Sequence, residues 1–136
     1  MNLLTLNPMA LSDMLVHAAE SYPNECCGIV LGSSSAISQT VRARNLATEP
    51  RRNYVVDPLA ILKAESGDRS ISVDIAGFYH SHPDHPGVPS GLDMEQSWDT
   101  YLYIIIPVFG GKAGVPRAWR FVDRIPVEIA LVSEAS

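Results

Sequence analysis

The stretch IAGFYHSHP, residues 75–83, joins an apolar segment to a pair of histidines. Residues 75–79 are rich in apolar and aromatic side chains and predict a β-strand. Residues 81–90 are rich in proline, histidine and glycine and predict a loop. His80 and His82 are therefore expected at the end of a strand.

A second apolar run, YLYIIIPV at residues 101–108, predicts a buried central strand because it is continuous and rich in β-branched and aromatic side chains. Residues 27–31 and 37–44 predict a hairpin. Residues 110–116 predict a turn, and residues 45–53 a loop. The remaining predicted strands are an edge strand at 3–6 and short strands at 54–56, 118–122 and 127–131.

Three segments predict helices. Apolar residues recur at helical spacing over residues 8–22, and Pro23 ends that helix. Asp57 and a following proline predict the start of a second helix over residues 58–65. Residues 92–98 predict a short third helix. About seven strands mixed with three helices indicate an α/β or α+β fold, in which helices flank a curved mixed β-sheet.

The chain of 136 residues has the length of a single domain, residues 1–136. Apolar residues make up 46% and charged residues 18%, a balance that excludes intrinsic disorder. The net charge is −5 and the basic residues are scattered, so a nucleic-acid partner is not expected. Cys26 and Cys27 are adjacent, point to opposite faces of an extended chain, and predict no disulfide. We find neither a signal peptide nor a membrane-spanning run and expect a cytoplasmic protein.

The chemically distinctive residues are His80, His82, Ser90 and Asp93. Residues two apart in an extended chain point to the same side, and a carboxylate from the first turn of the next helix could face them. Two imidazoles and one carboxylate leave a fourth tetrahedral position open, as in catalytic zinc sites. Two structural alternatives remain open: solvated loop histidines, and a capping box formed by Ser90 and Asp93.

A zinc-water hydrolase also needs a base that is not a metal ligand. Glu25 follows the first predicted helix and precedes an apolar strand, from which it could approach the histidine pair. The alternative is a solvated loop carboxylate.

These residues together resemble the JAMM (MPN+) metalloprotease family, whose motif is Glu, then His-Ser/Thr-His, seven residues, Ser, two residues and Asp. Glu25, the HSH triplet at 80–82, the seven residues 83–89, Ser90 and Asp93 meet every position. The resemblance implies a JAMM/MPN core, which is similar to that of cytidine deaminases.

The resemblance also implies roles for individual residues. His80, His82 and Asp93 would hold one Zn²⁺ per chain. Glu25 would be the general acid/base, and Ser90 would hydrogen-bond to the oxyanion. The reaction would be amide or isopeptide hydrolysis without a covalent intermediate, so Cys26 and Cys27 are expected to pack near the site.

The short chain resembles the stand-alone prokaryotic members of the family. The resemblance implies a zinc-dependent hydrolase acting at the C-terminal Gly-Gly of a small ubiquitin-like or sulfur-carrier protein. One alternative is a non-catalytic MPN module that binds or scaffolds such a partner. A zinc deaminase is disfavoured because the sequence lacks its His-x-Glu and Pro-Cys-x-x-Cys motifs. The motif does not specify the carrier, the residue released or the oligomeric state.

Five further residues have less specific expectations. We expect His85 to be solvated in its loop, although it could be a stray ligand. His17 is expected on the surface of the first helix. Trp98 and Trp119 are expected in the core or at its rim. Tyr54 could line a substrate groove.

Overall fold

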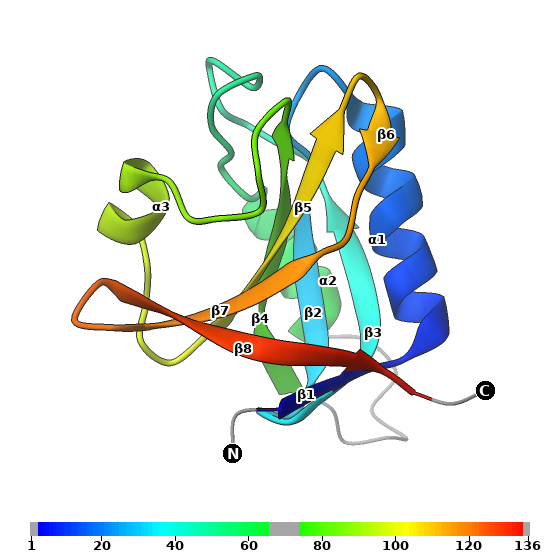
Figure 1. Cartoon of the computed structure of the whole chain (residues 1–136), viewed down its shortest axis with the longest axis vertical. Coiled ribbons are helices and arrows are strands. Elements are labelled where there is room, and N and C mark those ends of the chain that lie inside the picture. Colours follow the sequence, from blue (N-terminus) through cyan, green and yellow to red (C-terminus); the bar gives the residue numbers. More distant parts are fainter. Residues whose placement is uncertain (1–2, 66–73, 135–136) are drawn as a thin grey trace.

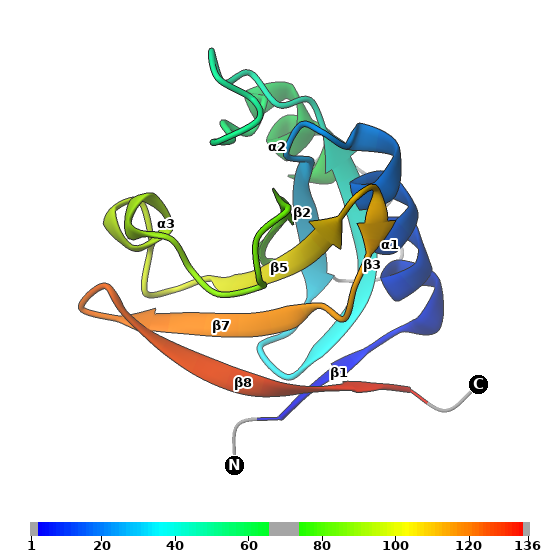
Figure 2. The ribbon, with the colours of Figure 1, turned by 45° about the horizontal axis from the view of Figure 1, so that its top comes forward.

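The computed structural model describes residues 3–65 and 74–134, which form an eight-stranded mixed sheet with three helices. Its strands follow the order β4-β2-β3-β1-β8-β7-β5-β6, and β4 also pairs with β5, so seven strands close into a ring (Figures 1 and 2). The curved mixed sheet and flanking helices are as predicted. The strands are β1 (Leu3–Leu6), β2 (Cys27–Gly32), β3 (Ala36–Ala43), β4 (Asp74–Pro83), β5 (Leu102–Phe109), β6 (Lys112–Ala113), β7 (Arg117–Val122) and β8 (Ile125–Ser133). The helices are α1 (Pro8–Ser21), α2 (Pro58–Glu65) and α3 (Gly91–Glu95).

The β4–β5 pair lies at the centre of the molecule. The two strands run parallel, with Gly77 opposite Leu102 and Pro83 opposite Val108. Strand β2 pairs antiparallel with the other edge of β4. Every residue of β5 except Phe109 is buried, which confirms the expected central strand.

The helices α1 and α2 cover opposite faces of β2, because successive strand residues point to opposite sides. Val30 packs in the cluster that contains Met14 of α1. Ile29 and Leu31 pack instead with Ala60 of α2. Helix α1 begins where the Asn7 side chain accepts hydrogen bonds from two backbone amides, and a proline occupies its first turn.

Two of the predicted strands differ from the structure. The strand β1 is not at an edge, because it lies parallel to β3 on one side and β8 on the other. Its alternate residues Leu4 and Leu6 are buried, so both its backbone edges and its apolar side chains are satisfied within the sheet. Residues 54–56 do not form a strand; they make one isolated bridge, between Val56 and Asn45.

Several predicted boundaries also shift. The strand β4 continues to Pro83 because its backbone goes on pairing with β5, so the predicted loop at 81–90 begins later. The predicted turn at 110–116 contains β6, which pairs with β5. Helix α3 ends at Glu95, short of the predicted 92–98, and strand β8 is longer than the predicted 127–131.

His17 is half-buried rather than on the surface, because α1 turns it toward β4. Its Nδ1 atom lies 2.7 Å from the buried Tyr79 hydroxyl. Burial lowers the pKa of His17, the positive charge of Arg42 lowers it further and Glu20 opposes the shift, so that the pKa is about 4.

Within the described ranges, none of the helices is long and apolar enough to cross a membrane.

Gly77 of β4 lies opposite Leu102 of β5 with no room for a side chain, so we expect Gly77→Ala to destabilise the fold. A Cβ atom there would overlap the carbonyl oxygen and amide nitrogen of Leu102, which are backbone atoms that cannot swing aside. The expected loss is about 3 kcal/mol of unfolding free energy, measured by chemical denaturation. Gly91→Ala is the control, since a Cβ at Gly91 meets nothing within 4 Å. Equal stability of the two variants would contradict the expectation.

The buried His17 should make stability depend on pH. The pKa is about 4 in the folded protein and about 6.5 in the unfolded chain, so the unfolded chain binds more protons between these values. Stability should therefore fall as pH drops from 6.5 toward 4, by about 1–2 kcal/mol after allowance for partial exposure. Denaturation of wild type and His17→Gln across this range measures the difference, and parallel curves would contradict it.

Candidate metal centre

The end of β4 and the start of α3 bring together the three predicted ligands. The Nε2 atoms of His80 and His82 lie 3.1 Å apart. The Oδ2 atom of Asp93 lies 3.3 Å from Nε2 of His80 and 3.0 Å from Nε2 of His82. The two histidines are buried and Asp93 is half-buried, and His82 lines a hollow in the surface.

The local sequence explains this convergence. His80 and His82 are two residues apart on a continuing strand, so both rings project from the same face. Ser81, between them, points to the opposite face, where its hydroxyl accepts a hydrogen bond of 2.8 Å from the amide of Cys26. Pairing of β4 with β2 and β5 thus fixes the backbone from which both rings extend.

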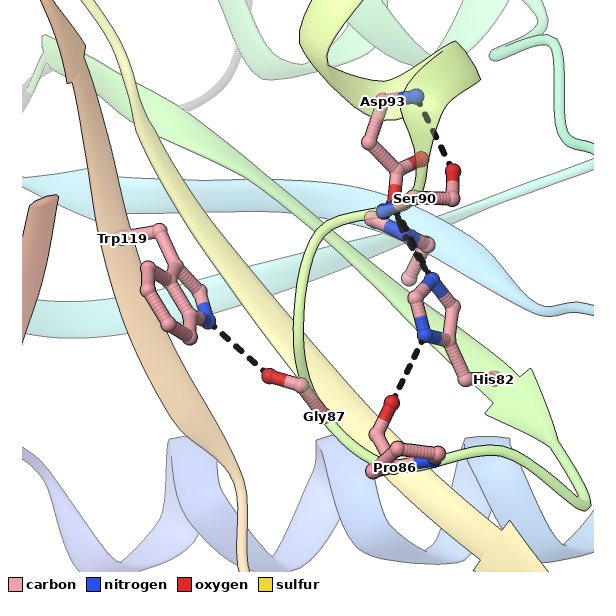
Figure 3. Close-up of polar contacts among 7 residues, drawn as sticks. His82, Pro86, Gly87, Ser90, Asp93 and Trp119 are labelled. Carbon is pink, nitrogen blue, oxygen red and sulfur yellow. Dashed lines mark hydrogen bonds and ion pairs between the residues drawn. The ribbon is translucent and has the colours of Figure 1, made fainter. Parts of the chain in front are cut away.

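The orientation of His82 is set by the loop that follows β4. Its Nδ1 atom lies 2.9 Å from the Pro86 carbonyl oxygen, to which a protonated Nδ1 donates (Figure 3). That hydrogen bond places the proton on Nδ1 and, in the neutral ring, leaves the Nε2 lone pair facing Asp93.

The orientation of Asp93 is set by a capping box at the start of α3. The Ser90 amide donates to Oδ2 of Asp93 at 2.9 Å, and the Asp93 amide donates to the Ser90 hydroxyl at 3.0 Å (Figure 3). The capping box and the predicted ligand position are therefore compatible. Ser90 and Asp93 cap the helix, and Asp93 also faces the two histidines.

The loop between the histidines and α3 is attached to the rest of the fold through Gly87 and Asp84. The buried indole Nε1 of Trp119 on β7 donates to the Gly87 carbonyl at 2.9 Å (Figure 3). Asp84 accepts hydrogen bonds from the Tyr22 hydroxyl at 2.7 Å and the Gly110 amide at 2.9 Å. These contacts hold the segment that carries the Pro86 carbonyl.

The electrostatics suit a cation. Burial would raise the pKa of Asp93, but hydrogen bonds with His80 and His82 hold it well below its usual range, so the carboxylate is ionised. Burial lowers the pKa of His80 and keeps it neutral. For His82, burial lowers the pKa, but the contacts with Asp93 and Pro86 raise it overall. Metal ligation needs a neutral imidazole, so protons and a metal would compete at His82.

The donor set and its spacing fit zinc. Ligand atoms around a tetrahedral zinc ion with bonds of about 2.0 Å lie about 3.3 Å apart. The three separations between His80, His82 and Asp93 are 3.1, 3.3 and 3.0 Å. Two nitrogens and one carboxylate oxygen are also ligands that zinc accepts.

Glu25 enters the same hollow from the segment before β2. Its amide donates to the Pro50 carbonyl at 2.7 Å, and its carbonyl accepts from the Asn45 side-chain amide at 3.0 Å. The side chain is buried and lines a cleft of about 580 Å³ together with His82 and Ser90. Burial raises the pKa of Glu25 to about 8; the positive charge of His82 opposes the rise and Asp93 adds to it.

The two cysteines pack near the site, as predicted: Cys27 lies opposite His80 in the β2–β4 pair, and the Cys26 amide donates to the Ser81 hydroxyl. Both are buried free thiols. Burial raises the pKa of Cys26 to about 11 and that of Cys27 to about 12. Neither is a thiolate near neutral pH, so neither has the character of a nucleophile.

The predictions for the remaining aromatic residues and for His85 have different outcomes. Tyr54 stacks on His80, with ring centroids 4.3 Å apart. Trp119 is buried, as expected, but its hydrogen bond to the loop was not predicted, because it joins residues 32 positions apart. Trp98 is 67% exposed, which contradicts core packing. His85 is exposed in the cleft and lies outside the group of three ligands.

Comparisons with known proteins identify a matching family and several similar proteins. A family described as prokaryotic homologues of the JAB domain matches residues 8–122. The chain is 38% identical to a desampylase of Haloferax volcanii over 109 residues, which cover 75% of this chain and 78% of the relative. It is 28% identical to a probable TtuB-protein conjugate cleaving protease of Thermus thermophilus, over 76% of this chain and 69% of that protein. A solved structure from Desulfitobacterium hafniense is similar, with a TM-score of 0.84 and 26% identity, covering 98% of this chain and 94% of the other.

The Trp119–Gly87 hydrogen bond should stabilise the loop that orients His82. We expect Trp119→Phe, which keeps an aromatic ring but removes the donor, to cost about 1–2 kcal/mol of stability. Amide hydrogen exchange in residues 84–90 should become faster, while exchange in α1 should change little. The same variant should bind zinc more weakly in a chelator competition. Unchanged exchange in the loop would show that the hydrogen bond does not restrain it.

Proposed function

Because the chain belongs to the family of prokaryotic homologues of the JAB domain, we propose that it is a zinc-dependent peptidase of the JAMM type. Its reaction would be hydrolysis of an amide or isopeptide bond at the C-terminal Gly-Gly of a ubiquitin-like or sulfur-carrier protein. The observation that carries this proposal is the convergence of His80, His82 and Asp93 beside a cleft that His82 and Glu25 line.

The relatives support the class of substrate. One is named a desampylase and another a probable protease that cleaves TtuB-protein conjugates. The chain covers 78% and 69% of these two proteins, so the similarity extends over most of each. We therefore propose that this chain catalyses the same type of reaction, the cleavage of a conjugate of a small carrier protein.

His80, His82 and Asp93 would hold the zinc ion. When bound there, zinc supplies Lewis acidity, which lowers the pKa of a bound water to about 7 and polarises the scissile carbonyl. The carboxylate of Asp93 and a neutral His80 are already in the protonation states that ligation needs.

Glu25 would take the proton from the attacking water and deliver it to the leaving amine. Its buried carboxyl has a pKa of about 8 without a metal, and a nearby dication would lower that value toward neutrality. A carboxyl that titrates in this range can both accept and return a proton near pH 7.

Ser90 would donate a hydrogen bond to the oxyanion of the tetrahedral intermediate. Its oxygen already accepts from the Asp93 amide, and its hydroxyl proton is free to point into the cleft, which Ser90 also lines. The capping box would thus hold the Ser90 oxygen in place, while the side chain keeps a donor for the substrate.

Mutation of Glu25 separates metal binding from turnover. We expect Glu25→Gln to retain one zinc per chain and to lose at least about 10²-fold in turnover, since the base is removed and the ligands are not. Asp93→Asn should bind zinc weakly, because the only anionic ligand is lost. Mass spectrometry of a carrier protein extended beyond its Gly-Gly end, together with metal analysis, measures both effects.

Three results would count against the proposal. Cleavage that persists after exhaustive chelation would refute the metal mechanism. Full turnover by Glu25→Gln would remove its role as the base. A zinc-loaded wild type that binds the carrier and its conjugates but cleaves neither would favour the binding module instead.

A further inference from the structure

Two arginines line the cleft above the candidate metal centre. Arg51 and Arg52 belong to the segment between β3 and α2, and they line the same cleft as His82 and Ser90. Both arginines are exposed, and neither takes part in any ion pair found among residues 3–65 and 74–134. Two guanidinium groups without an ion pair among the described residues thus line the cleft of a protein whose net charge is −5.

The backbone that carries these arginines is tied to the base. The Pro50 carbonyl, immediately before Arg51, accepts the Glu25 amide at 2.7 Å. The Arg52 amide donates to the Glu49 carbonyl at 3.0 Å, closing a turn. The Asn45 side-chain amide bridges the carbonyls of Glu25 and Asn53, at 3.0 Å each. Arg51 and Arg52 therefore start from fixed positions beside Glu25.

We propose that Arg51 and Arg52 bind a carboxylate of the substrate within the cleft. This inference rests on the proposed function and specifies its substrate further. A guanidinium group presents paired N–H donors that match a carboxylate, and its charge persists at any physiological pH. The other basic residues are scattered along the sequence and do not extend the arginine pair into the basic stripe that a nucleic acid needs. A carboxylate is therefore a better ligand for the two arginines than a phosphate backbone.

The carboxylate has two chemical sources in a substrate of this class. It is either the α-carboxylate of a residue released from beyond the Gly-Gly end, or an acidic side chain on the carrier protein itself. In the first case the arginines would select substrates with a free C-terminus close to the scissile bond. In the second they would guide an acidic carrier to the cleft, with a marked dependence on ionic strength.

The test compares a double variant with a matched control. Arg51→Gln with Arg52→Gln removes both charges from the cleft. Lys63→Gln with Arg124→Gln removes the same net charge from α2 and from the β7–β8 turn, outside the cleft. Zinc content and circular dichroism establish that both proteins are folded and loaded.

Three probes identify the source of the carboxylate. Two are synthetic peptides that end in Gly-Gly-Ala, one with a free α-carboxylate and one with a carboxamide. The third is an acidic carrier protein conjugated through its Gly-Gly end to a lysine. Binding to each is measured by calorimetry in the Glu25→Gln background, and KM and kcat are measured with active protein.

We expect removal of the cleft arginines to raise Kd and KM at least about tenfold for one probe class, with little change in kcat, whereas the control variant leaves them unchanged. A loss confined to the free-acid peptide identifies the α-carboxylate as the ligand. A loss confined to the carrier conjugate, reduced at high salt, identifies the acidic carrier surface.

Equal behaviour of the two double variants on all three probes would overturn the inference, as would a failure of zinc-loaded protein to bind any of them. Arginine-dependent binding without cleavage by wild type would instead retain the carboxylate site and reject the proposed hydrolysis. Cleavage that is indifferent to the arginines would retain the hydrolysis and reject the carboxylate site.

Discussion

The 3.1 Å separation between the Nε2 atoms of His80 and His82 is the constraint around which the site is organised. Two buried imidazole nitrogens this close need a proton or a cation between their lone pairs, and a negative charge beside them favours a cation there. Asp93 supplies that charge from another element. The continued pairing of β4 up to Pro83 positions the histidine pair, and the capping box orients Asp93 toward it.

The parts of the site that depend on local spacing could be predicted from the sequence. Alternation along a strand puts His80 and His82 on one face, and the Ser90–Asp93 spacing determines the capping box. The central strand at 101–108 was equally predictable, because a continuous apolar run needs burial on both faces.

The remaining features depend on closure of the sheet, which local patterns do not encode. The short apolar segment of β1 predicts an edge strand, but β1 pairs with both β3 and β8 and is therefore an interior strand. The sequence predicts Trp119 in the core or at its rim. Its hydrogen bond to Gly87 depends on the pairing of β7 with β5, which the sequence pattern does not specify. Tyr54 has no periodic partner in the sequence, and its stacking on His80 arises because the segment between β3 and α2 crosses the site.

That crossing segment links the chemistry of the base to recognition of the substrate. Pro50 and Asn45 hold the backbone of Glu25, and the same turn continues directly into Arg51. The arginines would hold an anionic group of the substrate beside this turn, in the cleft that Glu25, His82 and Ser90 also line. The arrangement thus places a positively charged binding region next to the residues that would hold the metal. A neutral Gly-Gly segment is the part of a substrate that could lie between them, since it is narrow and adds no charge of its own.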